Sequence, residues 1–248
     1  MTATTTPTTS TLDPWRLRVA GLCALLGTVA NIVAGVLHGR LSAGSGVGSS
    51  AVIFRHVLDT PSWAVDNLVS LLTMFAWLAV FVALGHRVDT RNSGWVGRLA
   101  AVTLAIGTAL VAVLYLTDAY TIPALAHQWA AASPGEQHQL VATGDLVQRV
   151  IRMPLFNVLP TFVLGLPFAL YGLAQLHRPG PVPTWTAVVA GITGLAAFVI
   201  GLSWIAGSDT VPEIVLWVVI QPLIWVWGIA TGIAVLLSSA RTATSRSA

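Results

Sequence analysis

The chain has 248 residues, of which 55% are hydrophobic and only 8% are charged. Soluble domains carry about 25% charged residues, so this composition excludes a soluble globular protein and indicates a multi-pass membrane protein. All twelve basic residues are arginines that stand singly around hydrophobic segments, which is typical of topology signals, and we expect no nucleic-acid partner.

Six hydrophobic segments are long enough to cross a bilayer as helices. We therefore predict an all-α fold, a six-helix transmembrane bundle that forms one membrane domain over residues 13–240. A Thr-rich, disordered tail (residues 1–12) precedes this domain, and a C-terminal tail (residues 241–248) follows it. The predicted spans are approximately residues 15–37, 62–85, 94–117, 152–176, 184–206 and 212–238.

The second span has a polar stripe, because Asp66, Ser70, Thr73 and Trp77 fall on one face at helical spacing. Polar groups exposed to lipid are costly, so we expect this face to pack against other helices. The fifth span carries small residues at helical spacing (Gly191, Gly194, Ala197 and Gly201), which predicts a close-packed helix interface.

The segment between the third and fourth spans contains a helix-capping sequence, Ser133-Pro134-Gly135-Glu136. It predicts an amphipathic helix on the outer surface, over residues 134–150, that runs into the fourth span. Asp145, Arg149 and Arg152 share one face of it. Asp145 and Arg149 stand at the i, i+4 spacing of an expected ion pair. In the fourth span, Pro154, Pro160 and Pro167 predict kinks that free backbone carbonyls.

Arginine counts give the orientation, since eight of the twelve fall on the side of the two termini. We predict a cell-membrane protein with both termini in the cytoplasm. Tryptophans at the ends of the spans are expected to form an interfacial belt: Trp15, Trp63, Trp95, Trp129 and Trp185.

With this orientation, the polar residues of the spans gather in the outer half of the membrane. Scattered packing contacts would not favour one half, so we predict a pocket there; the alternative is exposure at the interface and amide bonds between helices. The candidate catalytic residues are the carboxyl groups of Asp66, Asp118 and Glu213. The candidate substrate-binding residues are Asn31, His38, Trp77, Arg152, Asn157, Trp217, Gln221 and Trp225.

No sequence pattern indicates a metal or an organic cofactor, and we expect neither. The histidines lack ligand spacing, and His38 and His86 lie at opposite ends of their spans, which excludes a haem held by this pair. The chain has one cysteine, and it contains no nucleophile elbow and no dinucleotide fingerprint.

The remaining chemistry is acid–base catalysis. A carboxyl group near apolar walls is a usable proton donor, and indole rings stabilise cations. These features favour an enzyme of the lyase or isomerase class that acts on a hydrophobic small molecule, a membrane lipid or isoprenoid. Two alternatives stay open: a small-solute or proton-coupled transporter, for which six spans would require a homodimer, and a non-catalytic partner subunit.

Over most of its length the chain resembles uncharacterised six-span integral membrane proteins of high-GC bacteria. The resemblance depends on Pro61-Ser62-Trp63, on Asp118 followed by Ala124-Leu125 and Trp129-Ala130-Ala131-Ala132, and on the Arg149 region. It implies membrane insertion and no particular activity.

In design the chain is also similar to the small integral membrane terpene cyclases. Fungal members have an acidic residue directly after a Phe-Ala-Trp-like run, whereas Phe75-Ala76-Trp77 is followed here by Leu78. No catalytic residue is transferred on that basis.

Overall fold

The computed structural model describes residues 14–37, 49–85, 94–177, 182–208 and 210–244. The predicted N-terminal tail and His38 lie outside these residues, as does the end of the predicted C-terminal tail. Residues 241–244 of that tail continue the last helix.

The described residues are all-α, and six long apolar helical segments could each cross a membrane. This confirms the predicted fold class and number of spans. The α-helices are α1 (Pro14–Leu37), α2 (Ser50–Asp59), α3 (Trp63–Gly85), α4 (Gly94–Leu116), α5 (Ile122–Ala131), α6 (Pro134–Val147), α7 (Met153–Val158), α8 (Leu166–His177), α9 (Thr184–Ile205), α10 (Glu213–Val215) and α11 (Gln221–Thr244). Four π-helical turns join them: η1 (Thr117–Thr121), η2 (Gln148–Arg152), η3 (Leu159–Val163) and η4 (Leu216–Ile220).

The polar stripe of α3 is buried against α1, as the sequence predicts. Its four residues are at most 3% exposed. The Thr73 hydroxyl donates a hydrogen bond to the carbonyl of Gly27, and the Trp77 indole donates one to the Thr28 hydroxyl at 3.1 Å. Thr73 and Trp77 therefore find hydrogen-bond partners on α1 rather than facing lipid.

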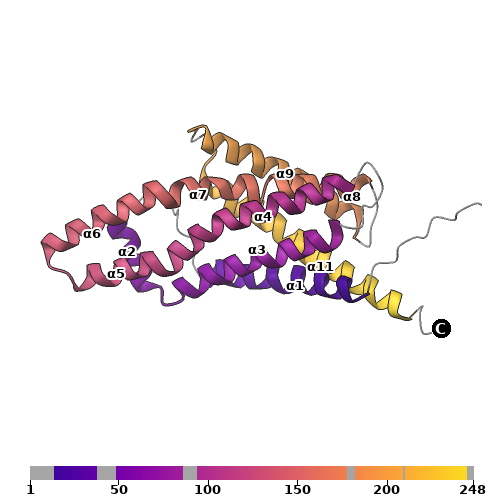
Figure 1. Cartoon of the computed structure of the whole chain (residues 1–248), viewed down its shortest axis with the longest axis horizontal. Coiled ribbons are helices and arrows are strands. Elements are labelled where there is room, and N and C mark those ends of the chain that lie inside the picture. Colours follow the sequence, from indigo (N-terminus) through magenta and orange to yellow (C-terminus); the bar gives the residue numbers. More distant parts are fainter. Residues whose placement is uncertain (1–13, 38–48, 86–93, 178–181, 209, 245–248) are drawn as a thin grey trace, which may run out of the picture.

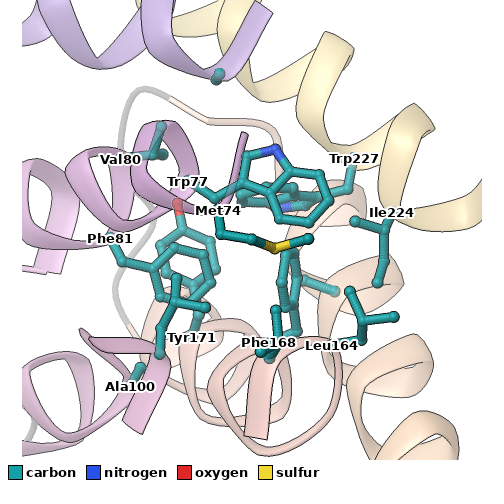
Figure 2. Close-up of a cluster of buried hydrophobic side chains, with 14 of the residues drawn as sticks. Met74, Trp77, Val80, Phe81, Ala100, Leu164, Phe168, Tyr171, Ile224 and Trp227 are labelled. Carbon is teal, nitrogen blue, oxygen red and sulfur yellow. The ribbon is translucent and has the colours of Figure 1, made fainter. Parts of the chain in front are cut away.

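Aromatic rings fill the centre of the bundle between α3, α8 and α11 (Figure 2). Neighbouring rings lie at centroid distances of 4.7–5.8 Å, within the range of favourable aromatic contacts. We call this group the aromatic plug; it comprises Trp77, Phe81, Phe168, Tyr171 and Trp227.

Two of the helical segments are too long for the membrane alone. Residues 94–131 form one helical segment of 38 residues and residues 134–177 form another of 44, about 57 Å and 66 Å at 1.5 Å per residue. The hydrocarbon core of a bilayer is about 30 Å thick. The excess forms a hairpin of α5 and α6 that extends beyond the bundle at one end, with α2 packed across it (Figure 1).

We call α2, α5 and α6 the cap. It has its own small core of Phe54, Val57, Trp63, Ile122 and Ala126. The carboxylate of Asp145 ties α6 to α2 by accepting hydrogen bonds from the Ser50 amide at 3.0 Å and the Ser50 hydroxyl at 2.7 Å.

The cap changes several expectations from the sequence. The capping box at Ser133 and Glu136 is present, and α6 continues into the fourth span as predicted. An amphipathic surface helix is not confirmed, because only Gly144 of α6 is buried. Helix α2 was not predicted. Trp63 lies in the cap core and Trp129 packs against it, while the interfacial belt stays a prediction.

Three of the four π-helical turns end two residues before a proline. The sequences at these points are Ile122-Pro123, Met153-Pro154 and Gln221-Pro222. A proline within a helix lacks an amide hydrogen, and its ring clashes with the carbonyl four residues earlier. A wider π turn relieves that clash, so the prolines account for the position of these three turns.

The glycine face of α9 packs closely on α8, as predicted. An added Cβ at Gly194 would lie 2.3 Å from the amide nitrogen of Ala169, whereas at Gly191 the nearest atom would be 3.9 Å away. The two positions on one helix therefore differ in the space that they offer.

We predict that Gly194→Ala lowers the free energy of unfolding by about 1–3 kcal/mol, because α8 and α9 must separate. Gly191→Ala is the matched control, and it should leave stability unchanged or raise it by up to about 1 kcal/mol through helix propensity. Thermal unfolding of the detergent-solubilised proteins measures both. Equal melting temperatures for the two variants would contradict the packing described here.

Candidate functional site

A pocket lies in the half of the bundle nearest the cap, where α1, α3, α4 and α11 meet η3 and η4. One wall is formed by α1 and α11, and Trp217 of η4 and Leu159 of η3 close it. The lining residues are Asn31, Gly35, Met74, Tyr115, Leu159, Trp217, Gln221 and Trp225.

A hydrogen-bonded amide pair forms the polar part of the pocket. The Asn31 Oδ1 atom accepts hydrogen bonds from Gln221 Nε2 at 3.0 Å and from Trp225 Nε1 at 2.8 Å. Both amides are buried, at 6% and 5% exposure. Among the described residues, neither the Asn31 Nδ2 group nor the Gln221 Oε1 atom has a partner, so the pocket offers one donor group and one acceptor.

No lining residue carries a formal charge at neutral pH. The cavity volume is about 20 Å³, which is room for about one water molecule. Trp217 and Trp225 are only half-buried, so this wall of the pocket reaches the surface of the bundle.

The pocket brings together four of the residues predicted from the sequence, namely Asn31, Trp217, Gln221 and Trp225. Trp77 packs in the aromatic plug instead. Asn157 is half-buried outside the lining. His38 lies outside the described residues.

The three candidate carboxyl groups have different surroundings, and none of them lines the pocket. Asp66 is buried in the first turn of α3, where its Oδ2 atom accepts a hydrogen bond from the Ser62 hydroxyl at 2.8 Å. Glu213 accepts a hydrogen bond from the Trp217 indole at 2.7 Å. Because Trp217 lines the pocket, Glu213 is in direct contact with its wall.

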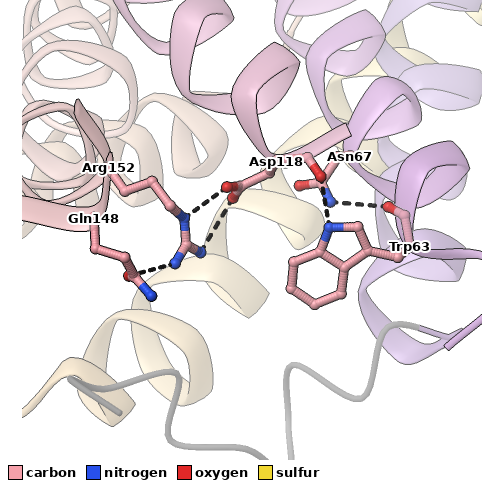
Figure 3. Close-up of polar contacts among 5 residues, drawn as sticks. All are labelled: Trp63, Asn67, Asp118, Gln148 and Arg152. Carbon is pink, nitrogen blue, oxygen red and sulfur yellow. Dashed lines mark hydrogen bonds and ion pairs between the residues drawn. The ribbon is translucent and has the colours of Figure 1, made fainter. Parts of the chain in front are cut away.

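Asp118 forms a two-pronged ion pair with Arg152 (Figure 3). The Arg152 Nε atom lies 2.6 Å from Asp118 Oδ1, and its Nη2 atom donates to Oδ2 at 3.2 Å. The Arg152 Nη1 atom donates to Gln148 Oε1 at 2.7 Å. This pair joins η1 to η2, and Arg152 is therefore not grouped with Asp145 as expected. Both oxygens of the Asp118 carboxylate face the Arg152 guanidinium, so the carboxylate is already engaged by a strong partner.

Sequence reasoning missed four lining residues as site residues: Gly35, Met74, Tyr115 and Leu159. Met74 and Leu159 look like ordinary core residues in the sequence. The missed signal is proline, because prolines set the position of most π turns and the pocket lies beside these turns. Tyr115 stands just before η1, Leu159 begins η3, and Trp217 lies in η4. Turns of this kind occur frequently at functional sites.

Comparison with known proteins adds no family: the chain matches no protein-family model, no curated protein and no solved structure. The resemblance to six-span membrane proteins is therefore supported only by the six candidate spans.

We predict that Asp118→Asn destabilises the protein by about 3 kcal/mol, because it leaves the largely buried Arg152 guanidinium without its counter-charge. The Asp118→Asn/Arg152→Gln double variant should recover part of this loss. Arg149→Gln, at an exposed position one turn away, is the control and should change stability by less than about 0.5 kcal/mol. Thermal unfolding in detergent measures all three, and an unchanged Asp118→Asn variant would contradict the role of the pair.

Proposed function

We propose that the pocket binds the neutral polar head of a membrane-soluble amphiphile, and that an isoprenoid alcohol is the best-fitting class. The observation that carries this proposal is the amide pair, which presents a free donor group on Asn31 and a free acceptor on Gln221. A hydroxyl group satisfies both, since it accepts one hydrogen bond and donates another.

The absence of charge from the lining selects against charged heads. A phosphate or an ammonium group would lose its hydration in this pocket without meeting an opposite charge, which is costly. The nearby guanidinium of Arg152 is already paired with Asp118. A neutral head is therefore favoured over a diphosphate.

The small cavity supports binding of a head rather than of a whole chain. A hydroxyl has about the size of the one water molecule that the cavity accommodates. The hydrocarbon tail then lies between the half-buried rings of Trp217 and Trp225 and continues into the lipid. We place this pocket in the outer leaflet, with the cap outside the cell, on the arginine distribution.

The chemistry that we propose is a proton-initiated isomerisation or cyclisation of the bound isoprenoid. A carboxyl group adds a proton to an alkene, a new carbon–carbon bond forms at the cation, and a base removes a proton, so that substrate and product have the same composition. Of the three candidate acids, Glu213 is favoured because it contacts Trp217, and an indole face stabilises a nearby cation. Asp66 is the second candidate.

We predict that geranylgeraniol raises the melting temperature of the purified protein and that geranylgeranyl phosphate does not, because only the alcohol has a neutral head. Asn31→Leu should weaken the binding about tenfold through the lost hydrogen bond. Gly35→Leu should also weaken it by filling the pocket, since the nearest atom to an added Cβ is 3.7 Å away.

Asn157→Leu is the matched control, because this amide lies in the same half of the bundle but outside the lining, and it should bind like the wild type. Equal shifts for the alcohol and the phosphate would contradict the proposal. So would equal losses for Asn31→Leu and Asn157→Leu.

We also predict that Glu213→Gln lowers conversion of geranylgeraniol to an isomeric product by about 10²-fold or more, the scale of a lost general acid. Its affinity should stay within about threefold, because the Gln side chain still accepts the Trp217 hydrogen bond. Chromatography with mass spectrometry on proteoliposomes measures the conversion, and Asp66→Asn tests the second candidate. No conversion by the wild type would end the enzymatic step while leaving the binding proposal standing.

A carrier is the second candidate function, favoured by the aromatic plug. Met74 lines the pocket and also lies beside the plug (Figure 2), so the plug adjoins the pocket, in the position that a closed gate would take. On this proposal a proton-coupled homodimer moves the bound amphiphile past the plug. Transfer of geranylgeraniol between leaflets of proteoliposomes without conversion would favour the carrier; binding with neither transfer nor conversion would favour a non-catalytic subunit.

A further inference from the structure

The backbone carbonyl of Asp118 has no regular donor in its own helix. In an α-helix its partner would be the amide of Ile122, but that amide donates to the carbonyl of Thr117 across the π turn η1. In a π-helix its partner would be residue 123, and Pro123 has no amide hydrogen. A buried carbonyl left in this state is costly unless another group supplies a donor.

Trp63 supplies that donor. Its indole Nε1 atom donates a hydrogen bond to the Asp118 carbonyl at 2.6 Å, between groups that are both buried (Figure 3). The donor comes from the first residue of α3, distant in the sequence from η1. The bond therefore joins the start of the second span to the π turn of the third.

Trp63 is itself held firmly from the cap side. Its ring packs in the cap core with Phe54, Val57 and Ile122. The His56 ring of α2 meets the Trp63 ring edge-on at a centroid distance of 5.6 Å. The backbone carbonyl of Trp63 accepts a hydrogen bond from Asn67 at 2.9 Å. Its position is thus fixed by α2, α3 and α5 together.

The π turn that Trp63 holds also places part of the pocket. Tyr115 lines the pocket and lies less than one turn before the Asp118 carbonyl. The Asp118 side chain, on the same turn, pairs with Arg152 of η2. If η1 closed to a regular α turn, the residues on its two sides would rotate relative to one another by about 100°, and Tyr115 and the cap could not both keep their contacts.

We propose that Trp63 is a positioning residue of the pocket, which holds η1 open through its indole N–H and thereby couples the cap to the orientation of Tyr115. The effect of Trp63 on the pocket rests on the proposed function, whereas its effect on η1 does not. A purely space-filling role for Trp63 makes a different prediction, because phenylalanine would then replace it with little loss.

The test is Trp63→Phe in the full-length protein, which keeps an aromatic ring and removes the N–H. We predict about tenfold faster hydrogen–deuterium exchange of the amides in residues 117–122, the scale of one lost hydrogen bond, with exchange in α9 unchanged. Trp129→Phe is the matched control, because Trp129 packs against the same cap core and its indole N–H has no partner among the described residues. Equal exchange in the two variants would overturn the inference.

A double-variant cycle with Pro123→Ala identifies the carbonyl as the target. Alanine restores the missing amide hydrogen, so the Asp118 carbonyl regains a donor and Trp63→Phe should have little further effect on exchange in this background. Additive effects of the two substitutions would contradict the mechanism.

Geranylgeraniol affinity completes the experiment, and Trp63→Phe should lower it about fivefold while Trp129→Phe leaves it unchanged. If exchange rises in Trp63→Phe and the wild type does not bind geranylgeraniol, the positioning role stands and the proposed function fails. If the wild type binds and exchange in Trp63→Phe is unchanged, the proposed function stands and this inference fails.

Discussion

The structure depends on a backbone constraint: proline cannot donate a hydrogen bond inside a helix. In a membrane helix the groups that this leaves unpaired cannot turn to water, so they must be satisfied by the protein itself. Pro123, Pro154 and Pro222 each stand two residues after the end of a π turn. Two of these turns flank the pocket, and two carry the residues of the Asp118–Arg152 ion pair.

The constraint explains why polar groups gather at one end of the bundle. Around η1, the Asp118 carbonyl takes its donor from Trp63 and the Asp118 carboxylate takes its counter-charge from Arg152. The Asp118 carboxylate and the Arg152 guanidinium neutralise each other, so neither places a net charge beside the pocket. The pocket is left with the two amides and the indoles, which supports the proposal that it binds a neutral group by hydrogen bonding and apolar contact.

The six spans and the buried stripe of α3 could be predicted from the sequence because both depend on local hydrophobicity and helical spacing. Asn31, Trp217, Gln221 and Trp225 could be predicted as members of one pocket because they lie at similar depth in the first and last spans. Of the cap, the capping box predicts a helix where α6 lies, but α2 and α5 are short helices of ten residues each and were not predicted. The partner of Arg152 was missed because the π turns change which residues share a face.

Helical spacing fails at these turns for a definite physical reason. A π turn adds one residue, which rotates everything beyond it by about 100° relative to a regular helix. Arg152 therefore does not continue the face of Asp145, which bonds to Ser50 of α2 instead, and it reaches Asp118 on the neighbouring helix. In a span that contains an internal proline, faces should be assigned separately before and after the π turn that precedes the proline, which here is η2. Assigned in this way, Arg152, the last residue of η2, is no longer expected on the face of Asp145 in α6.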